Sequence, residues 1–239
     1  MLHRGVALPV FSAFQPSTLT ERSHETIDHI VFSVATTDAM RASFQHAGQF
    51  VKMRVHDEAG APHEGIFALA TAPFEDRFLF LARTNNPAGG EAADRIARMP
   101  IGAPLEITLP AGDGFPLERA HGRDLAFVAV GTAIAPVRSA LEVVLRDRDR
   151  YGALSFDYGL RSLAHLPFAS DVERWRMLGV IVTLHVGELR ADGTYVGARA
   201  QDAVFARLAG SERTAILAVG HDALVRDVRA RFPDMLHNY

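Results

Sequence analysis

The chain has 239 residues, a formal net charge of −3 and no cysteine. Its hydrophobic content of 48% and charged content of 22% are typical of a globular protein with a sizeable core and exclude a disordered chain. The negative charge argues against nucleic acid as a partner, and the missing cysteines exclude disulfides, thiolate zinc sites and a cysteine-ligated iron–sulfur cluster. No apolar run approaches the ~20 residues of a membrane span, and the apolar run at the N-terminus is too short for a signal peptide, so we expect a cytoplasmic protein without membrane contact.

The first half of the chain alternates short β-branched or aromatic runs with turn residues, a pattern that favours an antiparallel barrel or sandwich. A helix is predicted over residues 89–99, because its acidic residues come early and its arginines late, as the helix dipole prefers. The predicted strands of this half are Ala7–Phe14, Ile27–Val34, Gln49–Val55, Gly65–Thr71, Arg77–Thr84 and Pro104–Pro110.

In the second half, apolar strands alternate with segments of helical spacing, which predicts a parallel sheet with right-handed crossovers. The predicted strands are Leu125–Val130, Leu154–Tyr158, Val180–Val186 and Ala215–Val219, and the predicted helices are Ala135–Arg150, Leu163–Met177, Ala198–Leu208 and Asp222–Phe232. Proline, glycine and charged residues gather between the two halves, at residues 116–123. We therefore predict an N-terminal antiparallel β-barrel over residues 1–118 and a doubly wound α/β domain with a parallel sheet over residues 119–239.

The segment Asp124–Leu141 carries the strongest local signal. A continuous apolar run ends at Gly131 and Thr132, the chain passes Pro136, and the apolar residues then take up helical spacing. A buried strand, a tight turn and a helix N-terminus in this order present backbone N–H groups to a phosphate. The segment is not the Gly-x-Gly-x-x-Gly fingerprint, because Ala133 stands where a second glycine would be, and an ordinary α/β turn without a ligand is the alternative.

Six further motifs, in chain order, resemble those of the ferredoxin–NADP reductase superfamily over nearly the full length. The turn at Gly131 is itself similar to the Gly-Thr-Gly-Ile-Ala-Pro turn of that superfamily. The resemblance implies a barrel that holds FAD or FMN, an α/β domain that binds NADH or NADPH, and electron transfer from the nicotinamide through the flavin to an external acceptor, for which a separate protein is a candidate. The six motifs are Ala47–Val51, Gly65–Pro73, Gly89–Gly90, Pro110–Phe115, Tyr158–Arg161 and Leu217–Leu224.

The same resemblance implies the residues of the two sites. The flavin-binding residues would be Phe67, Ala68, Leu69, Thr71, Gly89 and Gly90, with Tyr239 covering the flavin ring. The nucleotide-binding residues would be Gly131, Thr132, Pro136, Arg161, Gly220 and His221. For Arg161, contact with a 2′-phosphate and a solvated surface position are both open. For His221, a place beside the nicotinamide or as a proton donor stands against a structural role at a helix N-terminus.

The chain departs from the family at the flavin motif. The family's Arg, Tyr and Ser correspond here to Gly65, Phe67 and Ala68. An arginine on a diphosphate contributes about 1.5–3 kcal/mol per charge-assisted bond, so its loss weakens FAD binding unless another arginine replaces it. Two alternatives follow from this loss, namely a binding or regulatory module that has lost flavin, and a reductase component whose partner completes the flavin site. The candidate replacements are Arg54, Arg83 and Arg95.

The chain has eleven histidines, which raises the question of a metal site. His24, His29, His56 and His63 do not follow a recognised ligand spacing. We therefore predict no metal site and interpret these histidines as solvated loop residues.

Overall fold

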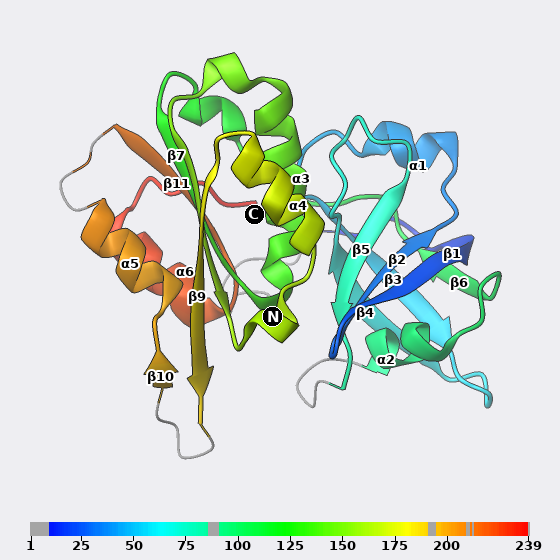
Figure 1. Cartoon of the computed structure of the whole chain (residues 1–239). Helices are drawn as coiled ribbons and strands as arrows, with labels where there is room; N and C mark the ends of the chain where they lie inside the picture. Colours follow the sequence, from blue (N-terminus) through cyan, green and yellow to red (C-terminus); the bar gives the residue numbers. More distant parts are fainter. Residues whose placement is uncertain (1–9, 86–90, 191–194, 209–210, 212, 239) are drawn as a thin grey trace.

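The computed structural model of the chain describes residues 10–85, 91–190, 195–208, 211 and 213–238 (Figure 1). The chain forms two parts, an antiparallel part built on a six-stranded sheet and a parallel part built on a five-stranded sheet. The expected order, an antiparallel sheet followed by a parallel sheet with helices on its faces, is confirmed, whereas the division after residue 118 stays a prediction.

The antiparallel part has the strand order β4-β3-β6-β1-β2-β5. The two edge strands meet through a bridge between Leu69 and Phe80, so the sheet curls into a barrel. We call the region between these two strands the β4–β5 seam. The elements are β1 (Gln15–Thr26), β2 (His29–Val34), α1 (Asp38–Ser43), β3 (Phe50–His56), β4 (Pro62–Ala68), β5 (Phe78–Arg83), α2 (Glu91–Arg98) and β6 (Pro104–Ile107).

The parallel part has the strand order β10-β9-β8-β7-β11, in which β10 alone runs antiparallel to its neighbour. Helices α3 and α4 pack on the face turned to the antiparallel part, and α5 and α6 cover the other face (Figure 1). The elements are β7 (Asp124–Val130), α3 (Ile134–Arg146), β8 (Leu154–Leu160), α4 (Ala169–Met177), β9 (Ile181–Leu189), β10 (Tyr195–Gly197), α5 (Ala200–Arg207), β11 (Thr214–Val219) and α6 (Asp222–Arg231). Short 3₁₀ helices cover Leu117–Ala120, Gly131–Ala133, Arg148–Arg150 and Leu163–His165.

The first predicted strand is wrong. Residues 10–14 of that prediction lie outside any strand, residues 7–9 lie outside the described residues, and β1 begins only at Gln15. Of the twelve residues of β1, Ser17 and Leu19 alone are buried. The strand pairs with β6 over its first four residues and with β2 from Leu19 onward. A strand with so few buried side chains lacks the apolar alternation by which strands are recognised. Helix α1 and strand β10 were also not predicted.

Helix length bears on membrane contact. Among the helices that the structure describes, none combines the length and the apolar character needed to cross a bilayer.

The segment after α6 connects the two parts. Leu236 forms a parallel bridge with Leu217 of β11, and the Leu236 N–H donates to the carbonyl of Ile216 at 2.7 Å. Asn238 then donates from Nδ2 to the carbonyl of Gly48 in the antiparallel part, also at 2.7 Å. The segment therefore runs along β11, the edge strand of the parallel sheet, and reaches the loop before β3 of the antiparallel part.

Arg138 of α3 makes a second connection between the parts. Its Nη1 donates to the carbonyl of Ala70 at 2.7 Å, and its Nε donates to Asp171 at 2.8 Å. Glu75 lies 3.4 Å away, and only 12% of the Arg138 side chain is exposed. Burial would lower the pKa of Arg138, but Asp171 and Glu75 hold it above its ordinary value. The guanidinium therefore stays charged in the boundary between the parts.

We expect Arg138→Met to lower the free energy of unfolding by about 3 kcal/mol, because it leaves buried acceptors without their donor. The measurement is urea unfolding followed by circular dichroism. The matched control is Arg176→Met, which removes an exposed ion pair with Glu173 within one helix and should change stability by less than about 1 kcal/mol. Equal effects of the two substitutions would contradict a buried connection at Arg138.

Candidate functional site

The carboxyl edge of the parallel sheet has a topological switch point. Strand β7 lies between β8 and β11. The strands that follow β7 in the chain are added on its β8 side, whereas β11 is added on the opposite side, so the strand order reverses next to β7. In open α/β sheets, ligands bind in the crevice at such a point. The two segments that leave the sheet here are Gly131–Ala133 and Gly220–His221.

The turn after β7 has the features of an anion-binding turn. Gly131 has φ +56°, a left-handed conformation that favours glycine, and a Cβ built on it would meet no atom within 4 Å. Gly131 and Thr132 are exposed, and helix α3 begins without a side-chain cap on its first N–H groups. The N–H group of Ile134, the first of α3, is bonded to the carbonyls of Gly131 and Thr132, so the donors and open space that the turn offers to a phosphate lie at its own start, at Gly131, Thr132 and Ala133.

Buried neighbours hold this turn in place. The Tyr158 hydroxyl donates to the Gly131 carbonyl at 2.9 Å, and burial raises the Tyr158 pKa, so the hydroxyl stays a donor. Val130 lies between two glycines, since a Cβ at Gly159 or Gly220 would come within 2.9 or 2.7 Å of a Val130 methyl group. The absence of side chains at these positions lets the loops after β8 and β11 approach the turn.

The remaining residues implied for the nucleotide site have varied positions. The His221 Nδ1 accepts from the Leu224 N–H at 3.2 Å and caps α6, which agrees with the structural alternative for this histidine. Pro136 is buried within the first turn of α3. Arg161 follows the end of β8 and pairs with Asp28 of the antiparallel part. Tyr239 lies outside the described residues, as do Gly89 and Gly90.

The flavin motif on β4 faces the inside of the barrel. Phe67 packs edge-on against Phe32 and Phe80, with ring centroids 5.6 and 6.5 Å apart, and is 7% exposed. A Cβ built on Gly65 would lie 2.8 Å from the Phe67 ring and 3.3 Å from the Cβ of Ala92. The Phe67 ring therefore fills the space in which the family's arginine side chain would begin.

The start of α2 beside Gly65 is acidic. Glu91 accepts from Arg95 at 3.1 Å and lies 3.0 Å from His63, while Asp94 accepts from the Asn85 N–H at 2.7 Å. Carboxylates already occupy the positive end of this helix dipole. With no cation at Gly65, these residues do not fit a flavin diphosphate at the family's position.

The other residues of the flavin motif lie at the end of the β4–β5 seam where the Leu69–Phe80 bridge joins the two strands. Leu69 is buried and donates from its N–H to the Gln49 carbonyl at 3.1 Å. Ala68 pairs with Phe50 on the outer face of the sheet. Thr71 is fully buried, and its hydroxyl has no hydrogen-bond partner within the described residues.

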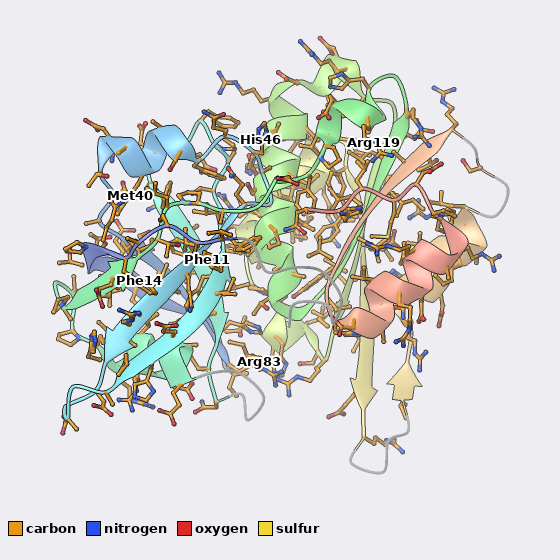
Figure 2. The ribbon with its side chains drawn as sticks, turned by 180° about the vertical axis from the view of Figure 1, so that it is seen from behind. Phe11, Phe14, Met40, His46, Arg83 and Arg119 are labelled. Atoms are coloured by element: carbon orange, nitrogen blue, oxygen red, sulfur yellow. The ribbon has the colours of Figure 1, made fainter. Side chains whose placement is uncertain are left out.

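The three candidate replacement arginines have different surroundings. Arg54 lies on the outer face of the barrel, where it binds Glu64 at 2.7 Å and stacks on the Phe14 ring at 3.9 Å. Arg95 pairs with Glu91 on α2. Arg83, at the end of β5, is the one that lies at the boundary of the two parts (Figure 2).

Arg83 belongs to a charged group that we call the Asp28 cluster, formed by Asp28, His29, Arg83 and Arg161. One Asp28 oxygen, Oδ2, accepts from the Arg83 Nε at 3.1 Å and also from Arg161. The other oxygen lies 2.8 Å from the His29 Nδ1. The Asp28 side chain is 13% exposed, and groups from both parts of the molecule compensate its charge.

Burial and charge act in opposite directions on the acid of this cluster. Burial alone would raise the pKa of Asp28, but the charges of His29, Arg161, His165 and Arg83 hold it below its ordinary value. Burial lowers the pKa of His29 more than Asp28 raises it. Near neutral pH the cluster therefore contains an ionised carboxylate, a neutral imidazole and two guanidinium groups.

The sequence analysis did not single out Asp28 and was wrong about His29, which is 4% exposed and lies on a strand. The strand prediction over residues 27–34 already placed His29 among alternating buried residues. That was the signal against a solvated loop histidine.

Comparison with known proteins agrees with the geometry of the parallel part. Residues 127–230 match a family model described as the oxidoreductase NAD-binding domain. The chain is 33% identical over 99 residues to the nitrate reductase [NAD(P)H] of Hordeum vulgare, covering 37% of this chain and 11% of the relative. It is 26% identical over 131 residues to the sulfhydrogenase 1 subunit gamma of Pyrococcus furiosus, covering 55% of this chain and 42% of the relative. The chain thus spans less than half the length of these curated relatives.

Solved structures share the fold over nearly the whole chain. A ferredoxin NADP⁺ reductase from Neisseria gonorrhoeae with bound FAD and NADP has a TM-score of 0.75 at 19% identity, covering 94% of this chain and 92% of that one. A ferredoxin-NADP⁺ reductase from Plasmodium falciparum with 2′P-AMP has a TM-score of 0.72 at 11% identity, covering 95% and 97%. The chain therefore shares the fold of these ferredoxin–NADP⁺ reductases, as its motif order indicated.

We expect Gly65→Ala to destabilise the protein by about 1–2 kcal/mol, because the added methyl group meets a packed aromatic ring. Urea unfolding measures the effect. In a Phe67→Leu background the ring is gone, so the same substitution should cost less, and the difference is the coupling between the two positions. If Gly65→Ala were as stable as the wild type, Phe67 would not fill this space.

Proposed function

We propose that this chain, which has the ferredoxin–NADP reductase fold and contains an oxidoreductase NAD-binding domain, is a flavin-dependent oxidoreductase. It would pass electrons from NADH or NADPH through FAD to an external acceptor. The observation that carries the proposal is the exposed turn of Gly131 and Thr132 at the switch point of the parallel sheet. Such a turn binds a diphosphate through backbone N–H groups, so Ala133 in place of a glycine does not remove the donors.

The residues around the turn have defined tasks in this proposal. The N–H groups of the turn hold the diphosphate of the nicotinamide nucleotide, and Tyr158 fixes the Gly131 carbonyl so that the turn keeps its shape. The absence of a side chain at Gly220 makes room for the Val130 side chain, so the segments after β7 and β11 lie close together beside the turn. Flavin, when bound, supplies hydride acceptance and stepwise electron release, and the protein's contribution is ring placement and exclusion of water.

The relatives support the class of reaction. The barley relative is named for NAD(P)H, and the Neisseria structure contains FAD and NADP. A separate acceptor protein, the cytoplasmic location and the choice between NADH and NADPH stay predictions from the sequence.

One structural observation favours a second candidate, a binding or regulatory module that has lost flavin. The Phe67 ring fills the space beside Gly65, and Glu91 adds negative charge there. On this alternative the Gly131 turn still binds a nucleotide, but no electrons are transferred.

A visible absorption spectrum tests the proposal and separates the two candidates. The purified protein is recorded before and after incubation with excess FAD and desalting. We expect retained absorbance near ~450 nm that NADH or NADPH bleaches, since hydride transfer reduces the flavin. A colourless protein that retains neither FAD nor FMN would overturn the proposal in favour of the binding module.

We expect Thr132→Asp to weaken NADH and NADPH binding about tenfold or more, because it places a carboxylate against the nucleotide phosphates. Titration calorimetry measures the Kd. An acidic residue at a helix N-terminus favours the helix, so the loss would not come from misfolding. The matched control, Thr132→Asn, has the same shape without the charge and should bind nearly as the wild type does, and unchanged binding by Thr132→Asp would exclude the turn as the phosphate site.

A further inference from the structure

We infer that Arg83 and Arg161, which meet on Asp28 at the boundary of the two parts, form a binding site for the diphosphate of a dinucleotide and supply there the positive charge that the chain lacks at Gly65. The inference rests on the proposed function, since it takes FAD or a nicotinamide nucleotide to bring a diphosphate to this boundary. It differs from that function in naming which side chains supply the positive charge.

Position is the first argument. Strands β4 and β5 are antiparallel at the Leu69–Phe80 bridge. Because the two strands run in opposite directions there, Gly65, four residues before Leu69, and Arg83, three residues after Phe80, both lie on the same side of the bridge. Arg83 thus lies toward the same end of the β4–β5 seam as the missing charge. Figure 2 shows it where the antiparallel part faces the parallel part.

Unused hydrogen-bond donors are the second argument. Arg83 gives its Nε to Asp28, and Arg161 gives one Nη2. Within the described residues, no other protein acceptor is seen for the remaining N–H groups of these two guanidiniums. Their side chains are 36% and 45% exposed, so these donors are accessible. Planar guanidinium groups with free edges suit the paired oxygens of phosphates.

Charge is the third argument. In the Asp28 cluster two guanidinium groups face one carboxylate, which leaves one net positive charge in the cluster. The start of α2 beside Gly65 instead carries Glu91, which pairs with Arg95, and Asp94. An anionic ligand is therefore attracted to the cluster and repelled from the family's position.

A buried, unsatisfied atom next to the cluster supports the same site. The Nε2 of His29 is buried and has no hydrogen-bond partner among the described residues. The other ring nitrogen, Nδ1, lies 2.9 Å from the Thr26 hydroxyl and 2.8 Å from the Asp28 carboxylate. Buried polar atoms are rarely left without partners. Because the neutral ring donates from Nδ1 to Asp28, Nε2 is an acceptor, so the group that satisfies it is a donor, such as a ribose hydroxyl of the dinucleotide, and not a phosphate oxygen.

Two sources of a diphosphate are open, FAD and the nicotinamide nucleotide. Three ligands distinguish them. FAD carries a diphosphate, FMN carries the same flavin with a single phosphate, and NADH carries a diphosphate without flavin. If the site binds the diphosphate of FAD, the arginine substitutions should raise the Kd of FAD strongly and the Kd of FMN less. If it binds the diphosphate of the nicotinamide nucleotide, they should raise the Kd of NADH.

The experiment measures the Kd values of FAD, FMN and NADH for the full chain and for Arg83→Gln and Arg161→Gln. We expect each variant to bind FAD or NADH at least about tenfold more weakly than the wild type, with the ligand that loses affinity naming the source. The matched control is Arg77→Gln, on an arginine just before β5 that pairs with exposed Glu21 and should leave all three Kd values unchanged.

Folding is checked by thermal unfolding of each variant. If Arg83→Gln does not fold, Arg83→Lys keeps the charge but not the planar pair of N–H groups, and we expect it to bind several-fold more weakly. Wild-type affinity of the arginine variants for FAD and NADH would overturn the inference and leave the proposed function intact. A wild-type chain that binds none of the three ligands would instead overturn the proposed function, and the inference with it.

Discussion

The burial of Asp28 is the constraint on which the arrangement of the two parts depends. A carboxylate that is 13% exposed is costly unless cations compensate it, and here the cations come from both parts of the molecule. Arg83 comes from the antiparallel part and Arg161 from the parallel part, so ionised Asp28 draws the two sheets together at one point. The β4–β5 seam and the carboxyl edge of the parallel sheet face each other as a result.

This arrangement explains how a chain with an altered flavin motif keeps a two-part site. The Gly131 turn needs only backbone N–H groups, so it tolerates changes in the side chains around it. The flavin side is different, because there the family relies on a side-chain charge that Gly65 lacks. The Phe67 ring packs with other apolar side chains at that end of the seam, and positive charge is found instead at the boundary of the parts.

The sequence predicted the parallel part well and the boundary poorly. Continuous apolar runs such as β7 are recognisable because such strands are buried on both faces. Strand β1 gave no such signal, because almost all of it is exposed or half-exposed. Alternation shows that Gly65 and Phe67 share one face of β4, but not whether that face points into the barrel. The pairing of Arg161 with Asp28, 133 positions away, depends on how two separately folded sheets meet, and no local pattern encodes it.

The segment after α6 has a consequence for the order of folding. Leu236 and Asn238 connect β11 to Gly48, a contact between residues 190 positions apart. Contacts of such sequence separation form late, because the chain must first pay the entropy of closing a long loop. During synthesis the barrel emerges first and has time to fold alone. Its boundary with the parallel part is completed only when residues 236–238 have left the ribosome, so an incomplete chain would carry a formed barrel with an uncovered face.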